Sequence, residues 1–303
     1  MEGRTANTLE FLEIFFFTTK TRRFEGQKRR RINGLLSGLL FSGAFFLLNP
    51  GGHTQCPVVN SVFGDGEEIR YTISYNWGPV WVDAGIITFS ASTEQYRDKT
   101  SWHLRATGKT YASYDLLFKV RDYYDTWIDP ATFRTFDFKR YTYEGGYTLI
   151  NTMNFDLVAG KVFSNTKTNN NPVRMDTLPI RLCTFDMLTA IYYTRTLDLS
   201  GIPAGSKKLI TVLIDDAYYD IYIRAMGNEI VESANGKRYR CNKFAAKMVQ
   251  GTIFKGDEDV LVWVTDDENK IPVYIEAKII VGTIKAYLKD YKGLRNQVSS
   301  LVR

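Results

Sequence analysis

The chain has 303 residues, of which 44% are apolar and 24% charged, so it can bury a core as one large domain or as two smaller ones. Its net charge of +6 comes mostly from residues 1–55, because the remainder holds 31 basic and 29 acidic residues. That near balance leaves no basic stripe on the part that folds, which argues against nucleic acid as a partner.

Residues 1–55 have the composition of a secretory leader. The basic run 28–31 (KRRR) precedes an uncharged, Leu- and Phe-rich segment at 32–48, and Asn-Pro-Gly-Gly follows it. The segment is at the short limit for a membrane span, which needs roughly 20 residues. We therefore expect export to the periplasm or the outer membrane, with cleavage near Thr54. A retained anchor and a buried core helix are the alternatives, and Cys56 is the residue that a lipidated form would use.

Alternation of apolar and polar residues dominates the chain after residue 56. Residues 68–75, for example, place Ile69, Tyr71, Ile73 and Tyr75 on one face and polar side chains on the other. The same pattern predicts strands in the first half at 68–75, 80–93, 101–110, 120–128, 132–143, 147–156 and 161–166. Residues 167–171, which Pro172 follows, are predicted to form a polar loop.

One helix is predicted, at residues 184–197. Phe185, Leu188 and Tyr192 recur at helical spacing and form a wide apolar stripe. Thr184 is a candidate N-cap, and Asp186 lies in the first turn, where the helix dipole favours an acid. We expect this helix to be buried against the sheet.

The second half again alternates. Strands are predicted at 208–215, 217–226, 239–250, 260–265 and 271–280. Residues 281–288 are expected to extend the last strand, and the basic tail from residue 289 is expected to fray. The predicted fold is mainly β. Residues 56–303 form either one large curved antiparallel sheet or half-barrel around a buried helix, or two β lobes joined near residues 170–205.

Cysteine and histidine are too few for most catalytic and metal sites. Cys183 and Cys241 either pair in an oxidising compartment or remain buried free thiols, since spacing alone does not decide between them. His103 is the one histidine outside the leader, and it lies in a strand-like stretch where an ordinary exposed or half-buried histidine is expected. A His-rich metal site is excluded, and we expect no metal, no cofactor and no nucleophilic triad.

Several short patterns resemble those of a known family. They are GEEIRY at 66–71, FDMLTAIYY at 185–193, VWVTDD at 262–267, IPV at 271–273 and VGTI at 281–284. Over about residues 60–290, the chain resembles a family of bacterial exported proteins of unknown function. The resemblance implies the envelope of a Gram-negative bacterium and a mostly antiparallel β fold, and it assigns no catalytic residue. By looser analogy, the fold resembles the curved half-barrels of periplasmic lipoprotein carriers, which hold acyl chains on a concave face.

Acidic clusters are the first candidate sites. Residues 257–259 (DED) and 266–268 (DDE) could ligate calcium, but they lack the spacing of a calcium loop, which favours solvated turns. Asp215 and Asp216 with Asp220 could form the carboxylate pair of a glycoside hydrolase. Because many β proteins offer such pairs, this reading carries little weight.

Aromatic side chains are the second candidate. Eight of them fall in predicted strands or at strand ends, where they either pack across strands or line a concave apolar surface: Tyr71, Tyr75, Trp77, Trp81, Tyr123, Trp127, Tyr218 and Tyr222. The working hypothesis is a non-enzymatic module that binds a hydrophobic ligand such as a lipid. A structural or assembly protein that docks an envelope protein, and a hydrolase that uses carboxylates alone, are the alternatives.

Overall fold

The structure is a computed structural model that describes residues 58–77, 80–169, 171–181, 183–198, 201–247, 260–278 and 282–303. The predictions for residues 1–55, for cleavage at Thr54 and for lipidation at Cys56 lie outside these residues. The acidic cluster at 257–259 and the side chain of Trp77 lie outside them as well.

The described part of the chain is almost entirely β. The strands are β1 (Glu67–Trp77), β2 (Val80–Tyr96), β3 (Lys99–Thr110), β4 (Val120–Ile128), β5 (Thr135–Glu144), β6 (Tyr147–Asp156), β7 (Lys161–Thr168), β8 (Asn171–Pro179), β9 (Thr184–Asp186), β10 (Lys207–Ile214), β11 (Ala217–Glu232), β12 (Arg238–Ala246), β13 (Val260–Thr265), β14 (Pro272–Lys278), β15 (Thr283–Lys292) and β16 (Leu301–Val302). The helical elements are the short 3-10 turn η1 (Ala112–Tyr114) and the α-helix α2 (Met187–Thr196).

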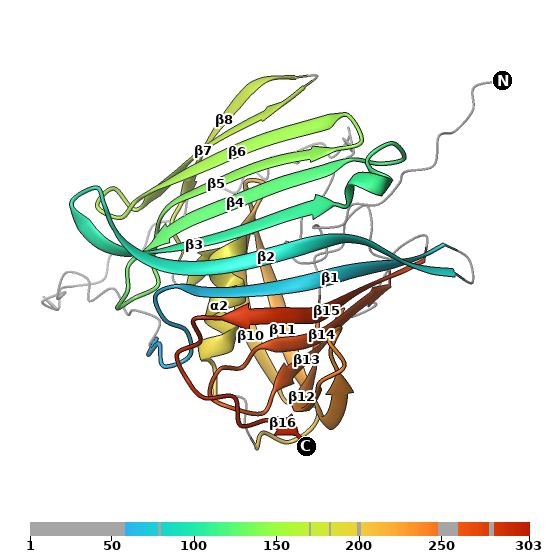
Figure 1. The fold of residues 1–303 in the computed structure, drawn as a ribbon. Coiled ribbons are helices and arrows are strands. Elements are labelled where there is room, and N and C mark those ends of the chain that lie inside the picture. The colour runs from blue at the N-terminus through green and yellow to red at the C-terminus, as the bar shows by residue number, and fades with distance from the viewer. Residues whose placement is uncertain are drawn as a thin grey trace, which may run out of the picture.

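All these strands belong to one 16-stranded sheet in the order β8-β7-β6-β5-β4-β3-β2-β1-β15-β14-β13-β12-β11-β10-β9, with β16 paired to β12. Neighbours are antiparallel except β9 and β10, which run parallel. The first strand lies in the middle, between β2 and β15. Figure 1 shows β3–β8 spreading away from β1 on one side and β15–β10 curling round on the other, so that α2 lies inside the curve. The predicted large curved antiparallel sheet with one buried helix is confirmed.

Side-chain contacts between strands that are far apart in the sheet order stabilise its curvature. Arg174 of β8 pairs with Asp216 in the turn between β10 and β11, and Arg140 of β5 pairs with Asp215 in the same turn. The hydroxyl of Tyr218 donates to the backbone carbonyl at the end of β8. The N-terminal half of the sheet, through β5 and β8, therefore contacts the C-terminal half at the turn between β10 and β11.

Three segments differ from the sequence prediction. The predicted loop at 167–171 is shorter, because β7 continues to Thr168 and β8, which was not predicted, begins at Asn171; β8 is an edge strand, where Pro172, a residue without an N–H, is tolerated. The C-terminal tail does not fray, because β15 continues to Lys292, Ser300 is buried and β16 adds to β12. Gly282, with a φ of 94°, precedes β15, and β15 is a separate strand antiparallel to β14, not an extension of it.

The helix begins later than predicted. Thr184 belongs to β9, and Asp186 is the N-cap, because its carboxylate accepts hydrogen bonds from the backbone N–H groups of Leu188 and Thr189. The other oxygen of Asp186 accepts from the hydroxyls of Thr126 on β4 and Thr135 on β5, at 3.0 and 2.6 Å. One buried carboxylate thus caps the helix and fastens it to the N-terminal half of the sheet.

The core lies between α2 and the concave face of the sheet. Tyr192 of α2 and Phe63, which precedes β1, are both buried, and their rings meet edge to face at a centroid distance of 4.9 Å. Leu188 packs on the same side of the helix and is fully buried. The wide apolar stripe predicted for this helix therefore serves as the centre of the core.

Candidate functional site

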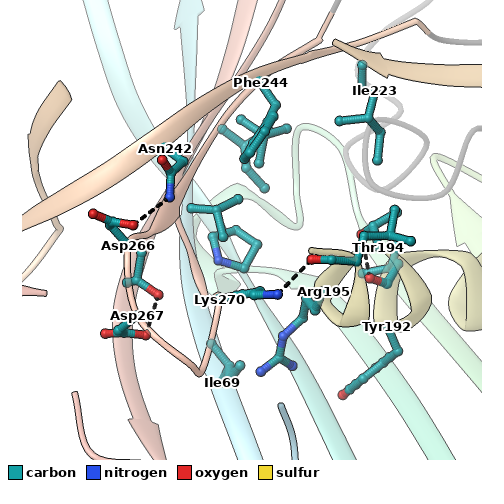
Figure 2. Close-up of a pocket in the computed structure, with 18 of the residues that line it drawn as sticks. Ile69, Tyr192, Thr194, Arg195, Ile223, Asn242, Phe244, Asp266, Asp267 and Lys270 are labelled. Atoms are coloured by element: carbon teal, nitrogen blue, oxygen red, sulfur yellow. Dashed lines mark hydrogen bonds between the residues drawn. The ribbon is translucent and has the colours of Figure 1, made fainter. Parts of the chain in front are cut away.

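A cavity of about 680 Å³ opens between α2 and the strands of the C-terminal half (Figure 2). This size is typical of small-molecule sites, which range over about 300–1,000 Å³. Most of the wall is apolar and comes from β1, β2, β11, β12, β13 and β14: Ile69, Tyr71, Phe89, Ile221, Ile223, Phe244, Ala246, Val260, Val262, Val264 and Ile275.

The two-residue period of the strands explains this wall. In β13, Val260, Val262 and Val264 all line the cavity, whereas Leu261 and Trp263 between them do not. Successive side chains of a strand point to opposite faces of the sheet, so every second residue of β13 reaches the cavity. The same spacing brings in Ile221 and Ile223 of β11, and the inner face of the curled sheet forms the wall.

The cavity has a buried end and an exposed rim. Ile69, Tyr71, Tyr192 and Arg195 are 5% exposed or less. The rim is formed by polar side chains that are exposed to solvent: Asp198, Asp266, Glu268, Gln297 and Ser299. The two adjoin, because Arg195 contacts Asn269 in the same loop that carries Asp266 and Glu268.

A buried ion pair between Arg195 and Glu67 lies beside the cavity. Arg195, in the last turn of α2, donates from Nη1 to Oε1 of Glu67 at 2.6 Å and from Nη2 to Oε2 at 3.0 Å. Nη2 also donates to the backbone carbonyl of Asn269 at 2.9 Å. Burial acts to lower the pKa of Arg195, but the neighbouring carboxylate outweighs it and the pKa stays above its ordinary value. The guanidinium is therefore charged, and its charge is already matched.

Two hydrogen-bond donors at the buried end have no acceptor among the residues that the structure describes. They are the hydroxyl of Tyr192 and the Nε–H of Arg195; both residues line the cavity with other atoms, but these two atoms are enclosed and do not open on it. Burial raises the pKa of Tyr192 well above its ordinary value, so this hydroxyl keeps its proton. Buried polar groups nearly always have a partner, and leaving one without costs about 1–3 kcal/mol.

The rim is held by its own hydrogen bonds. Lys270 donates from Nζ to the backbone carbonyl of Leu197 at 2.6 Å, and burial lowers its pKa. Asp267 accepts from the hydroxyl of Ser300 at 2.6 Å, and Asp266 accepts from the side-chain amide of Asn242 at 2.9 Å. These bonds engage two of the carboxylates offered above as calcium ligands. Among the described residues, no group of three or more His, Cys, Asp and Glu side chains is placed to hold a metal ion.

The seven aromatic candidates whose side chains the structure describes do not gather on one surface. Tyr71 lines the cavity, whereas Tyr75, although buried, does not. Trp127 is buried in a stack with Tyr96 and His103, at centroid distances of 4.5 and 4.7 Å.

The other candidates lie elsewhere. Trp81 and Tyr123 are 44% and 47% exposed. Tyr218 and Tyr222 are half-buried and each carries a cation over its ring, from Arg181 and Lys207 respectively.

The polar candidates have structural roles. His103 is half-buried, as expected, and its Nε2 lies 2.7 Å from Oδ1 of Asp125, which also accepts from Arg105. Asp215 and Asp216 are held by arginines, as described above, and Asp220 accepts from the hydroxyl of Thr211 at 2.7 Å.

Cys183 and Cys241, for which the sequence left both pairing and free thiols open, do not pair with each other. Cys241 is a buried free thiol, and Cys183 is disulfide-bonded but not to Cys241. Of the two alternatives left open by the sequence, the free thiol is therefore the correct one for Cys241. The two residues sit in unrelated surroundings, since Cys183 directly precedes β9 and Cys241 lies within β12.

Sequence reasoning missed most of the cavity. It favoured aromatic residues, whereas the wall is chiefly Ile and Val, and it assigned no role to Arg195. The usable signal was the alternation at residues 260–264, where three valines share one face.

Comparison with known proteins shows a fold and a family. The structure is similar to a crystal structure of a β-barrel-like protein of the domain of unknown function DUF1849 from Brucella abortus. The TM-score is 0.50 and the identity 9%, over 77% of this chain and 99% of that one, so the likeness is one of fold. No curated protein matches the sequence. Within the described residues, no helix is long and apolar enough to cross a membrane. Residues 70–289 match the family model described as Protein of unknown function (DUF3108), and the chain therefore belongs to this family.

Proposed function

We propose that the protein binds a hydrophobic ligand, such as a lipid, in the cavity beside α2. The observation that supports this proposal is the cavity itself, about 680 Å³ of space with an apolar wall inside a well-packed sheet. Protein interiors normally leave few voids larger than a water molecule, so a space of this size needs an occupant or a function.

The wall chemistry favours an acyl or similar chain. Burying a methylene group contributes about 0.8 kcal/mol, so a chain of ten methylenes gains about 8 kcal/mol before the costs of immobilisation are subtracted. Val262, Ile223 and Phe244 offer the chain nonpolar contacts and no hydrogen-bonding groups. Affinity would then depend mainly on chain length, with polar groups deciding orientation.

An exported location is part of the proposal. Disulfides persist in oxidising compartments, and the disulfide at Cys183 fits a protein that leaves the cytoplasm. The leader composition of residues 1–55 points the same way. An envelope location would put the cavity beside a large supply of lipids.

Docking of a protein partner is the second candidate, and one feature favours it. The edge strand β8 exposes Val173 and Met175, at 53% and 78%. A bare edge can accept another strand, but β8 also carries prolines near both ends and the charged Arg174, which are devices that discourage such pairing. The cavity therefore carries more weight than the edge.

The test is to express the full chain in a Gram-negative host, purify it under mild conditions, and analyse it by native mass spectrometry with organic extraction. We expect a lipid in near-stoichiometric yield. Val262→Phe, which fills the cavity from β13, should lose the lipid. Leu261→Phe is the matched control, since it adds bulk to the opposite face of the same strand, and it should keep the lipid. A ligand-free mass that persists after envelope lipids are added would overturn the proposal.

A further inference from the structure

We propose that Cys183 forms its disulfide with Cys56, so that a covalent bond joins the segment before β1 to the segment before β9 and α2. The sulfur of Cys56 is then unavailable for lipidation, the alternative that the sequence raised for this residue. The inference concerns how the chain matures, and it does not depend on whether the cavity binds a ligand.

The cysteine count leaves one pairing. The chain contains three cysteines, Cys56, Cys183 and Cys241. Cys183 is disulfide-bonded, whereas Cys241 is a free thiol that is 1% exposed within β12. The structure consists of a single chain, so the second sulfur of the bond belongs to the same chain. Cys56 lies outside the described residues, and elimination assigns it as the partner of Cys183.

The chain directly after Cys56 is fixed in the fold. Val58, two residues further on, packs against the core. The side-chain oxygen of Asn60 accepts hydrogen bonds from the backbone N–H groups of Val62 and Phe63, at 3.1 and 3.2 Å. Two extended residues span about 7 Å at most, so the tether from Val58 to Cys56 is short.

Phe63 shows where this segment runs. The centroid of its ring lies 4.9 Å from that of Tyr192 in α2 and 5.9 Å from that of Phe133 in the turn between β4 and β5. Asp186, the N-cap of α2, is bonded to β5 just after this turn, and Cys183 stands three residues before Asp186. The segment before β1 and the segment that carries Cys183 thus meet the same helix and the same turn. A disulfide requires such proximity, because its two Cα atoms lie within about 7 Å of each other.

The two described cysteines differ in access to solvent. Cys183 is exposed, so a second cysteine and an oxidant can reach its sulfur. Cys241 is buried, and burial raises the pKa of its thiol to about 12, which leaves almost none of the thiolate that attacks a disulfide. Cys183 is therefore the one of these two that can exchange disulfides while the protein is folded.

Bond formation is an oxidation by thiol–disulfide exchange. The thiols of Cys56 and Cys183 lose two protons and two electrons in total, and the two sulfurs become joined. A protein disulfide of an oxidising compartment takes up the electrons and protons and becomes two thiols, through a mixed disulfide with one of the cysteines.

The bond has a consequence for anchoring and one for stability. A lipid anchor on cysteine is attached through a thioether, and a sulfur already held in a disulfide cannot form one. Cys56 and Cys183 are 127 residues apart in the sequence, so the bond closes a long loop and restricts the unfolded chain.

The test is a peptide map of the full chain, expressed in a Gram-negative host and purified without reductant after free thiols are blocked with N-ethylmaleimide. Trypsin separates the cysteines, because it cuts after Arg70, Arg181 and Arg240. Without reductant, we expect the peptide that carries Cys56 to be linked to the peptide that carries Cys183. Dithiothreitol should release the two peptides, with the mass of one hydrogen added to each.

Matched variants give a second readout, the melting temperature with and without dithiothreitol. Reduction of the wild type should lower the melting temperature by roughly 5–15 °C, because the unfolded chain gains freedom when a long loop opens. Cys56→Ser, Cys183→Ser and the double variant should all melt at this lower temperature and should not respond to reductant. Cys241→Ala is the control, since it removes a thiol outside the bond and should keep the response to dithiothreitol.

Other outcomes of the peptide map overturn the proposal. A Cys183 peptide that carries maleimide, or that is linked to the Cys241 peptide, shows that the assigned bond is absent. A dimer that dithiothreitol dissolves on a gel shows a bond between two chains instead of one within the chain. A thioether-linked lipid on Cys56 would establish an anchor. Such a lipid stays on the peptide during organic extraction, whereas a ligand of the cavity is extracted, so the disulfide and the proposed function succeed or fail separately.

Discussion

Arg195 and Glu67 stand 128 residues apart in the sequence and form a two-point ion pair in the core, with side chains 5% and 0% exposed. The pair joins the last turn of α2 to the first residue of β1. Asp186 at the other end of the helix is bonded to β4 and β5. Both ends of the helical wall of the cavity are therefore fixed by buried charged groups.

Glu67→Gln tests the ion pair. Removal of one partner leaves the Arg195 charge buried and unmatched, which should lower the free energy of unfolding by about 3–5 kcal/mol, as measured by urea denaturation. Asp290→Asn is the control, because its pair with Arg70 is largely exposed and should hardly matter. Equal stability of Glu67→Gln and wild type would show that the pair is not a fixed point of the fold.

Asp186→Ala removes the helix cap and the acceptor of the Thr135 and Thr189 hydroxyls, while the Thr126 hydroxyl keeps the backbone carbonyl of Asp137 within reach. A lost cap costs about 0.5–2 kcal/mol, and each buried group left without a partner adds about 1–3 kcal/mol. We expect a total loss of more than about 3 kcal/mol in urea denaturation followed by circular dichroism.

The control for that cap is Asp129→Ala. Asp129 accepts from the backbone N–H groups of Ala131 and Thr132 in a partly exposed turn and holds no other element, so its loss should cost less. A similar loss for the two variants would mean that Asp186 acts only locally.

Asp122 should make stability fall as pH rises. It is buried on β4, and burial, followed by the charge of Glu144, raises its pKa well above its ordinary value. A carboxyl whose pKa is higher in the folded state stabilises fully below its unfolded pKa, and that contribution disappears as pH rises through the folded pKa. Asp122→Asn should therefore be more stable than wild type at pH 7, by about 1 kcal/mol or more, and should flatten the pH profile. Parallel profiles for variant and wild type between pH 4 and 8 would contradict this.

Cys241 should resist thiol reagents in the folded protein. The thiol is buried, and burial raises its pKa to about 12, so almost none of it is thiolate at pH 8. Maleimide should modify the Cys241 peptide only after denaturation, as read by mass spectrometry. Rapid labelling of the native protein would show that β12 opens readily, and Cys241→Ala identifies the labelled position.

Local pattern was enough to predict many of the strands. The expected bounds of β4, β6 and β13 match the structure, because each is a short stretch of clear alternation between turn residues. Strand β8 was missed altogether, because Pro172 and Pro179 at its ends speak against a central strand but leave an edge strand open. The tail was misjudged because Ser300 and Leu301 are ordered by contacts with β12 and Asp267, which the local sequence does not reveal.

The site was harder to predict than the fold. Alternation shows that Val260, Val262 and Val264 share a face, but not that this face borders a space instead of other side chains. That depends on how tightly the sheet curls around α2, which the long-range contacts of Arg195 and Asp186 determine. Aromatic residues attracted attention by their size, although most of them are used for stacking and packing elsewhere.

The place of β1 in the sheet has a consequence for the order of folding. Strands β1–β8 pair with their neighbours in sequence and can assemble while the rest of the chain is still being synthesised. β1 also needs β15, with Glu68 opposite Lys292, so one edge of the first strand stays open until almost the whole chain has emerged. The cavity, walled on one side by β1 and on the other by β11–β14, is thus complete only once the last strands have folded. A chain truncated before β15 would lack this cavity, and its β1 would have one edge open to pairing with another chain.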